Sequence, residues 1–227
     1  MATRAAAPRR SPTVDEMSAA VVRELRQRFP RSVVTRRGAP GGDPARLRAD
    51  GGEIPLIGVP WADADGRLTS VVLVGGTAPA PGQPVVAAVD DDACTSRVVR
   101  YAAEQARRLA VPLRVVHVWT GRDRATPCPR TRYHDGACDA DRLLSAVLYD
   151  HLPQEEADAA EREIRHDSET VPALTALSAT ASMIVVAACS RPLPAGECPL
   201  GDTVRALVGR TACPLAVLAP GPAVPTP

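Results

Sequence analysis

The stretch that decides the fold is PVVAAVDDDACTSRVVRYAAEQARRLAVPLRVVHVW, Pro84–Trp119. Its first apolar run, at 84–90, ends in acids, as a strand buried on both faces does. Apolar residues then recur at helical spacing from 98 to 109, and a second apolar run follows at 113–119. A strand, a helix and another buried strand in this order predict an α/β protein with a parallel sheet.

The rest of the chain continues this alternation. Apolar runs predict further strands at 183–188 and 214–219, and AEREIRH at 160–166 predicts a weaker strand before them, with helices between the strands. We therefore expect a five-stranded, mainly parallel sheet with helices on both faces over residues 83–220, followed by a Pro-rich tail at 221–227. A polar excursion at 120–142 interrupts the pattern and is expected to be a surface loop.

Residues 1–80 have a different pattern and predict a smaller α+β region. Thr13 and Glu16 have the T-x-x-E spacing of a capping box at the start of an amphipathic helix. Two β-rich runs flank Asp65-Gly66, which indicates a hairpin. Residues 76–84, GTAPAPGQP, are typical of a linker.

Composition excludes several classes of function. The net charge of +1 and the aromatic content of 3% provide neither the basic field nor the stacking platforms of a nucleic-acid-binding protein. No window has the roughly 18–20 apolar residues that span a bilayer. Every basic residue is Arg, so Schiff-base chemistry and a standard P-loop are both excluded.

The same composition suggests where the protein works. Six cysteines without a secretory signal segment are expected to be reduced thiols in the cytoplasm. Abundant Arg, Ala, Val and Pro without any Lys or Asn indicate GC-rich coding, and an actinobacterial source is the interpretation we favour.

From Asp90 onward the chain resembles a universal stress protein domain. The quoted stretch is similar to the family's first strand, Ala-rich helix and second strand. ASMIVVAACSR (181–191) and LGDTVRALVGRTACPLAVL (200–218) are similar to its fourth strand, glycine loop, last helix and last strand. The resemblance implies the Rossmann-like fold of adenine nucleotide alpha hydrolases. It also implies homodimerisation through the C-terminal strand and a regulatory protein partner.

In ATP-binding members of this family a G-x-x-G-x(9)-G-[ST] loop holds the phosphates. Laid onto this chain, its first glycine becomes Ala187 and its second becomes Ser190. The third is kept as Gly201, with one extra residue in the spacing. The next position becomes Asp202, and Thr203 keeps a hydroxyl beside it. Loss of two glycines weakens the close approach of backbone amides to an anion.

Two further positions match the nucleotide site of the family. Asp90 corresponds to the Asp near the ribose, and Val118 to the position that contacts adenine through its backbone. We expect the Asp202 carboxylate to cap the last helix and to repel a phosphate from its N-terminus. Asp91 and Asp92 add negative charge nearby. The resemblance thus predicts an ATP site at which nucleotide binding is weak or absent.

These observations favour a regulatory or binding protein in a stress response, with no enzymatic activity and no cofactor other than ATP. Two alternatives remain open. One is a slow ATPase that uses Gly201, Thr203 and Asp90. The other is a thiol-based redox sensor built on Cys189 and Cys198, which flank the glycine-poor loop.

The sequence also contains weaker motifs. Cys128, His134 and Cys138 could supply zinc ligands, but their spacing matches no common zinc module, and a loop with incidental thiols is the simpler interpretation. GECPLGDT at 196–203 has P-loop spacing with Asp in place of Lys. His117, inside an apolar strand, is interpreted as a core histidine with a satisfied hydrogen bond.

The N-terminal region has two weak resemblances. ELRQRFPRSVVTRRGAPGGDPARL (24–47) is similar to the late part of another stress-protein unit, which would make this region the remnant of a tandem protein. IPLIGVPWADADGRLTSVV (54–72) is similar to the strand-turn-strand of a CBS or GAF module. We favour the tandem remnant, and neither interpretation provides a usable site.

Overall fold

A computed structural model describes most of the chain. The described residues are 11–30, 33–35, 45–49, 52–76, 82–90, 92, 94–119, 133–166, 169–189 and 199–220. In these ranges, no helix combines the length and the apolar character that a bilayer crossing requires.

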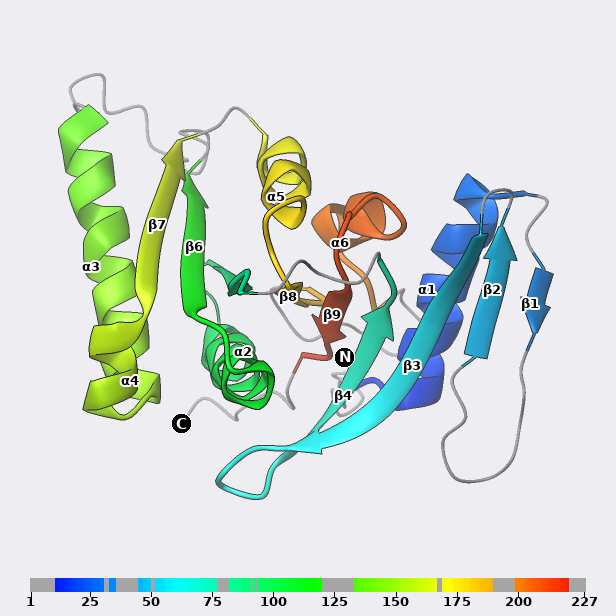
Figure 1. Cartoon of the computed structure of the whole chain (residues 1–227), viewed down its shortest axis with the longest axis horizontal. Helices are drawn as coiled ribbons and strands as arrows, with labels where there is room; N and C mark the ends of the chain where they lie inside the picture. Colours follow the sequence, from blue (N-terminus) through cyan, green and yellow to red (C-terminus); the bar gives the residue numbers. More distant parts are fainter. Residues whose placement is uncertain are drawn as a thin grey trace, which may run out of the picture.

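One sheet runs through the molecule, and it has nine strands in the described ranges (Figure 1). Their order across the sheet is β1-β2-β3-β4-β9-β8-β5-β6-β7. The strands are β1 (Val33–Thr35), β2 (Ala45–Ala49), β3 (Gly52–Ala62), β4 (Leu68–Val74), β5 (Val85–Val89), β6 (Leu113–Trp119), β7 (Glu161–His166), β8 (Met183–Ala187) and β9 (Leu215–Leu218).

The five predicted strands form the parallel half of this sheet. β5 pairs in parallel with β6 and with β8, while β6 pairs with β7 and β8 with β9. The class is therefore the predicted α/β class, and even the weakly apolar strand at 160–166 is confirmed as β7. The prediction of five strands for the sheet is wrong, because four more strands extend it beyond β9.

Those four strands come from the N-terminal region and are antiparallel throughout. β1, β2, β3 and β4 form a meander, and β4 then pairs antiparallel with β9, from Val71 opposite Leu218 to Val74 opposite Leu215. The hairpin predicted at Asp65-Gly66 joins β3 to β4, and Gly66 has the positive φ of 73° that favours glycine there. The interpretation of this region as the remnant of a tandem protein stays a prediction.

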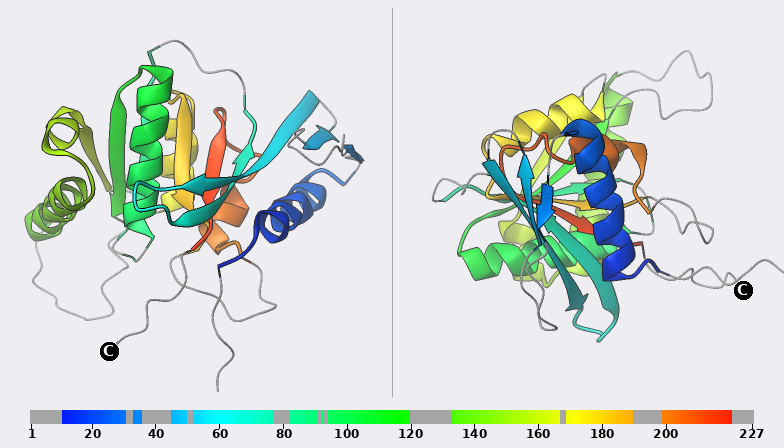
Figure 2. Two further views of the ribbon diagram at one scale, coloured as in Figure 1. Left: turned by 90° about the horizontal axis from the view of Figure 1, so that it is seen from below. Right: turned by 90° about the vertical axis from the view of Figure 1, so that its right-hand side faces the viewer.

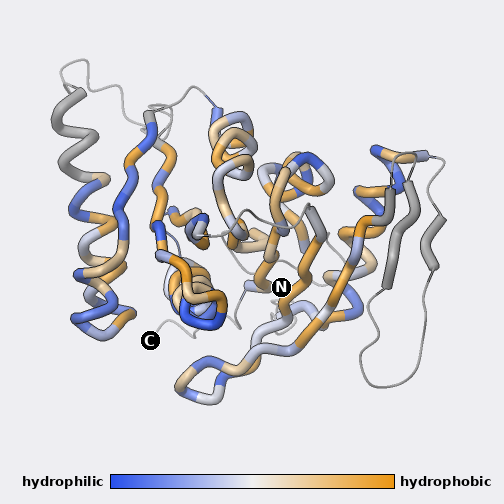
Figure 3. Tube along the Cα trace, in the orientation of Figure 1, coloured by the Kyte–Doolittle hydropathy of each residue, from blue (hydrophilic) through white to orange (hydrophobic). Residues whose placement is uncertain are grey.

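Helices cover both faces of the sheet (Figure 2). They are α1 (Val14–Arg28), α2 (Thr95–Leu109), α3 (Tyr133–His151), α4 (Gln154–Ala159), α5 (Thr170–Ser178) and α6 (Asp202–Leu207). One core joins α1, α5 and α6 to one face, and the other joins α2, α3 and α4 to the opposite face. Side chains alternate between them along each strand, as Val85 and Val86 do in β5. The central strands are accordingly apolar, and edge strand β7 is mostly polar (Figure 3).

The N-terminal helix packs directly against the end of the parallel half. The predicted capping box is confirmed, since the Glu16 amide donates to Thr13 Oγ1 and the Thr13 amide donates to Glu16 Oε2. At the other end of α1, the Arg28 guanidinium donates to the carbonyl of Val208. Arg205 Nε lies 2.9 Å from Glu24 Oε1. These contacts join α1 to α6, which lie side by side on one face.

On the opposite face, Trp61 fastens the β3–β4 hairpin to α2. Its indole N–H donates to Glu104 Oε2 at 2.6 Å, and its ring meets Tyr101 edge-on, with centroids 5.3 Å apart. Arg100 pairs with Asp65 in the turn at 2.8 Å. The N-terminal strands are therefore held to the parallel half on both faces as well as along β9.

The parallel half of the sheet is bounded by β7 and β9, and these two strands avoid pairing with another chain in different ways. β7 carries charged residues, and Arg114 bridges to Glu161 at 2.6 Å and to Glu163 at 3.4 Å; charges of this kind discourage pairing with another strand. β9 is covered by β4 of the same chain. The homodimer expected through the C-terminal strand would need this edge, so a second copy has no access to β9 while β4 remains in place.

The polar excursion is shorter than the sequence indicated. Helix α3 begins at Tyr133, so the last ten positions of the predicted loop, 133–142, are helical. Residues 120–132 lie outside the described residues. Leu144, Val147 and Leu148 are buried on one face of α3, as their helical spacing requires.

Cys213, just before β9, should make stability depend on pH. Burial raises the pKa of this thiol to about 11 from its ordinary 9.0. The folded state thus holds the thiol proton more tightly than the unfolded chain does. The stabilisation that results is complete below pH ~9 and is lost as the pH rises toward ~11. The free energy of unfolding can be measured by urea denaturation at pH ~8 and at pH ~10.5. Between these two pH values it should fall by about 1–2 kcal/mol more for the wild type than for Cys213→Ala. Equal losses would contradict the prediction. The comparison removes the contribution of Tyr101, whose pKa burial raises to about 12.

Candidate functional site

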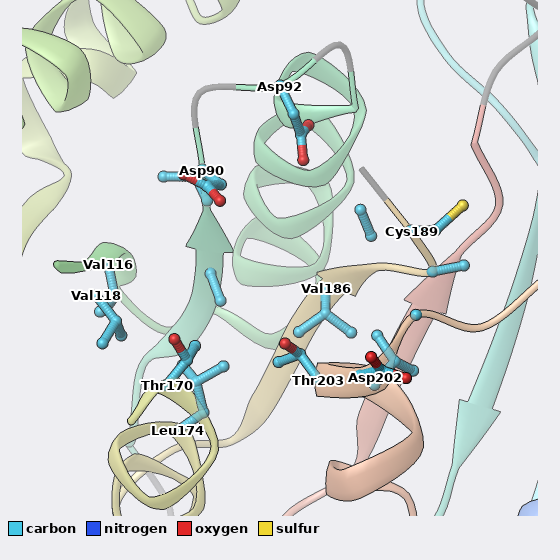
Figure 4. Close-up of a pocket in the computed structure, with 16 residues that line it drawn as sticks. Asp90, Asp92, Val116, Val118, Thr170, Leu174, Val186, Cys189, Asp202 and Thr203 are labelled. Atoms are coloured by element: carbon cyan, nitrogen blue, oxygen red, sulfur yellow. The ribbon is translucent and has the colours of Figure 1, made fainter. Parts of the chain in front are cut away.

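A pocket of about 540 Å³ opens at the carboxyl ends of the central parallel strands. Its floor comes from β5, β6 and β8, and its walls from the first turns of α5 and α6 (Figure 4). Apolar side chains form the floor, among them Val116, Val118 and Val186, and Leu174 and Val204 add apolar surface from the two helices. A volume of this size suits a small ligand.

The strand order explains why the pocket lies there. From β5 the chain crosses through α2 to β6 on one side, whereas β8 pairs with β5 on the other side. The two crossovers diverge at this point, and open α/β sheets bind ligands in the crevice that such a reversal leaves. The sequence resemblance had implied a site at these strand ends.

Negative charge surrounds the mouth of the pocket. Asp90 follows β5, Asp92 lies two residues further on, and Asp202 is the first residue of α6. The described residues that line the pocket include no Arg, Lys or His. Among the described residues that line the pocket, these three carboxylates are therefore the only charged side chains.

Asp92 stabilises the start of α2 at the mouth of the pocket. Its Oδ1 accepts hydrogen bonds from the amides of Cys94 at 2.7 Å and Thr95 at 3.1 Å, so it caps the start of α2. Burial raises the pKa of Asp92, the charge of Asp90 raises it further, and the hydrogen bonds from Cys94 and Thr95 oppose both. The hydroxyl of Thr95 also donates to the Asp90 carbonyl, which ties the end of β5 to the helix.

Asp202 does not play the part that the sequence suggested. The N-cap of α6 is Gly201, in an extended conformation, and no side chain caps the helix. The Asp202 side chain is fully exposed and lies 3.9 Å from Arg205. The predicted N-cap is wrong because Gly201 takes that position and the helix begins at Asp202, one residue earlier than expected. The carboxylate therefore belongs to the first turn of the helix and is exposed to solvent. Its charge remains at the pocket mouth, but it leaves the helix amides to other partners.

The structure brings together most of the other predicted site residues. Asp90, Val118, Ala187 and Thr203 all line the pocket, with Ala187 as the last residue of β8. The Gly201 amide donates to Ala188 at 2.6 Å, and neither its φ of −71° nor nearby protein atoms require glycine there. Ser190 lies outside the described residues.

Several lining residues were missed by sequence reasoning. Thr170 and Leu174 reach the pocket from α5, which no loop motif connects to it. Cys189, which had been considered only for its thiol chemistry, also lines the wall. The spacing of apolar residues on the predicted helix at 171–180 could have indicated a helix over the sheet, but not which of its turns faces the ligand.

Other candidates stay apart from this pocket. His117 is buried, and its Nδ1 lies 3.1 Å from the Val89 carbonyl, which confirms the core histidine. Among the described side chains, no group of three or more His, Cys, Asp or Glu could hold a metal ion. Cys128 and Cys198 lie outside the described residues, and the side chains of His134 and Cys138 are likewise not described.

The arrangement is suited to binding. An apolar floor can receive a flat ring, and threonine hydroxyls at 170 and 203 can donate to or accept from polar groups above it.

Part of this chain is similar in sequence to known proteins. Residues 82–219 match the sequence model of the universal stress protein family. Among solved structures, a universal stress protein from Archaeoglobus fulgidus is 26% identical, with 60% of this chain and 98% of that chain covered and a TM-score of 0.46. The universal stress protein from Archaeoglobus fulgidus in complex with dAMP is 24% identical (61% and 99% covered, TM-score 0.43). UspA from Lactobacillus plantarum is 18% identical (61% and 99% covered, TM-score 0.45). No curated protein sequence gives a significant match.

Proposed function

This chain belongs to the universal stress protein family, and from that membership we propose that it is a regulatory binding protein whose pocket holds a small ligand and disfavours a nucleoside triphosphate. The observation that carries the proposal is the charge of the pocket mouth. Asp90, Asp92 and Asp202 contribute three carboxylates, and the described lining contributes no cation.

Phosphate binding in α/β proteins depends on positive potential. Backbone amides at a helix N-terminus, glycines that let the chain approach the anion, and basic side chains normally supply it. In this chain the third glycine of the motif is kept as Gly201, but the first is Ala187 in a regular strand, and a carboxylate follows at 202. Each carboxylate repels a phosphate placed beside it, less strongly where water screens the charge.

The volume of the pocket does not limit the ligand. About 540 Å³ accommodates a nucleoside, and the apolar floor suits a purine-sized ring. We therefore expect an uncharged nucleoside such as adenosine to bind more tightly than Mg-ATP does, which reverses the order of affinity that a phosphate-binding loop produces.

Isothermal titration with adenosine and with Mg-ATP tests this proposal. Wild type should bind adenosine more tightly. Asp202→Ser should raise the affinity for Mg-ATP about 3- to 10-fold and leave adenosine unchanged, because only the triphosphate meets this charge. Asp150→Ser is the matched control, since Asp150 is exposed on α3, away from the pocket. Wild-type binding of Mg-ATP that is tighter than that of adenosine would overturn the proposal.

The ATPase alternative uses residues that line the same pocket, Gly201, Thr203 and Asp90. It predicts release of inorganic phosphate above the blank, and we regard it as the second candidate. A cytoplasmic location, a regulatory protein partner and homodimerisation stay predictions. A homodimer formed with β4 in place would use a surface other than the edge of β9.

A further inference from the structure

Two cysteines distant in sequence meet at the wall of the pocket. Cys94 is the N-cap of α2, and Cys189 follows the end of β8; Cys94 Sγ lies 3.4 Å from the Cys189 carbonyl oxygen. We propose that Cys94 and Cys189 form a reversible disulfide when a hydroperoxide oxidises Cys189. The inference concerns thiol chemistry alone and does not depend on which ligand the pocket holds.

The sheet keeps these two positions together. β5 and β8 are adjacent parallel strands, with Val85 opposite Met183 and Ala87 opposite Val185. Each cysteine lies just beyond the carboxyl end of one of these strands, at the same edge of the sheet. Given covalent bond lengths, an Sγ atom 3.4 Å from a carbonyl oxygen lies within about 6 Å of that residue's Cα. Side-chain rotation and a small shift of the chain at Cys189 would bring the sulfurs to bonding distance.

Exposure assigns the two thiols different roles. Cys189 is half-buried and lines the pocket, so a small peroxide can reach it. Cys94 is 3% exposed, which protects it from direct oxidation but leaves its sulfur against Cys189. Cys213 is buried away from the pocket, and burial raises the pKa of its thiol to about 11, so it stays protonated near neutral pH.

The reaction consumes one hydroperoxide for each disulfide. The Cys189 thiolate attacks the peroxide O–O bond, forms a sulfenic acid and releases an alcohol, or water when the oxidant is hydrogen peroxide. The Cys94 thiolate then attacks the Cys189 sulfur and displaces hydroxide, which takes up a proton to become water. Two thiols lose two electrons and two protons in total, and the peroxide is reduced.

This pairing differs from the one considered on sequence grounds. Cys189 and Cys198 flank the same loop, and their proximity in sequence suggested that they could close it. Cys198 lies outside the described residues. The contact of Cys94 with Cys189, in contrast, follows from the pairing of β5 with β8. The two pairings predict different linked peptides, so one experiment distinguishes them.

Hydrogen peroxide treatment of the full chain, followed by alkylation, digestion and mass spectrometry, tests the proposal. We expect loss of two alkylatable thiols and a linked peptide that joins Cys94 to Cys189, reversed by dithiothreitol. The link should persist in Cys198→Ala and Cys213→Ala. In Cys94→Ala it should disappear, and Cys189 should proceed to sulfinic acid, which shows that the oxidant still reaches a folded site.

Three results would overturn the proposal: a link between Cys189 and Cys198, no link at all, or a Cys94–Cys189 link formed equally well in urea-unfolded protein. The last would show that the fold does not bring the two thiols together. Circular dichroism of each variant before oxidation checks that the substitution itself leaves the fold intact.

Discussion

Replacing Trp61 by alanine is expected to lower the free energy of unfolding by about 3–5 kcal/mol. Trp61 is 7% exposed, and it packs in the core that also contains α2 and the central strands. The substitution removes a large buried ring, its edge contact with Tyr101 and the hydrogen bond to Glu104. The substitution should lower the stability of the whole chain and not of the hairpin alone, because the indole joins the N-terminal hairpin to the parallel half.

Urea unfolding followed by far-UV circular dichroism provides the measurement. A single transition should move to a lower midpoint. Trp61→Phe keeps an aromatic ring against Tyr101 but loses the indole N–H, so it should fall between wild type and Trp61→Ala. If two transitions appeared and only the weaker one moved, the N-terminal strands would be an independent appendage, in contradiction to the shared core.

A second large effect is expected on the opposite face of the sheet. Leu25→Ala in α1 should cost about 2–5 kcal/mol, because Leu25 is fully buried in the core shared with α6 and β9. Its side chain packs close to Gly209, where an added Cβ would lie 3.1 Å from Leu25 Cδ2. Removal of this side chain leaves a cavity between α1 and the parallel half.

Leu109→Ala provides the matched control for this substitution. Leu109 is also on a helix, at the end of α2, but is 46% exposed, so the same change should alter stability by less than about 0.5–1 kcal/mol. The two variants can be compared by urea midpoint. Equal losses at positions 25 and 109 would mean that the core around α1 does not contribute to global stability.

Much of the site could be predicted from the sequence because its strands can be recognised from a few consecutive apolar residues. Val85–Val89 and Met183–Ala187 are apolar throughout, and Asp90 marks the end of the first of these strands. Parallel strands place their carboxyl ends at one edge, so Asp90 and the residues after Ala187 had to meet there. The direction of the Asp202 side chain was not predictable, since it depends on which residue starts α6.

The N-terminal region shows the opposite case. Its capping box and its hairpin are local and were predicted from Thr13, Glu16 and Asp65-Gly66. Where the hairpin docks was not predictable, because the pairing of β4 with β9 joins residues more than 140 positions apart. The same holds for Cys94 and Cys189, which no spacing rule connects.

By itself, the sequence determined the five parallel strands of the C-terminal half, the capping box and hairpin of the N-terminal region, and the acidic character of the pocket. Hydrophobic period, caps and turn residues act over a few positions, and they therefore survive as signals in a linear chain. Only the tertiary structure decided that β4 covers β9, that Asp202 faces solvent and that the Cys94 thiol contacts the Cys189 carbonyl. Those outcomes depend on packing and strand pairing between segments far apart in sequence, which no local pattern encodes.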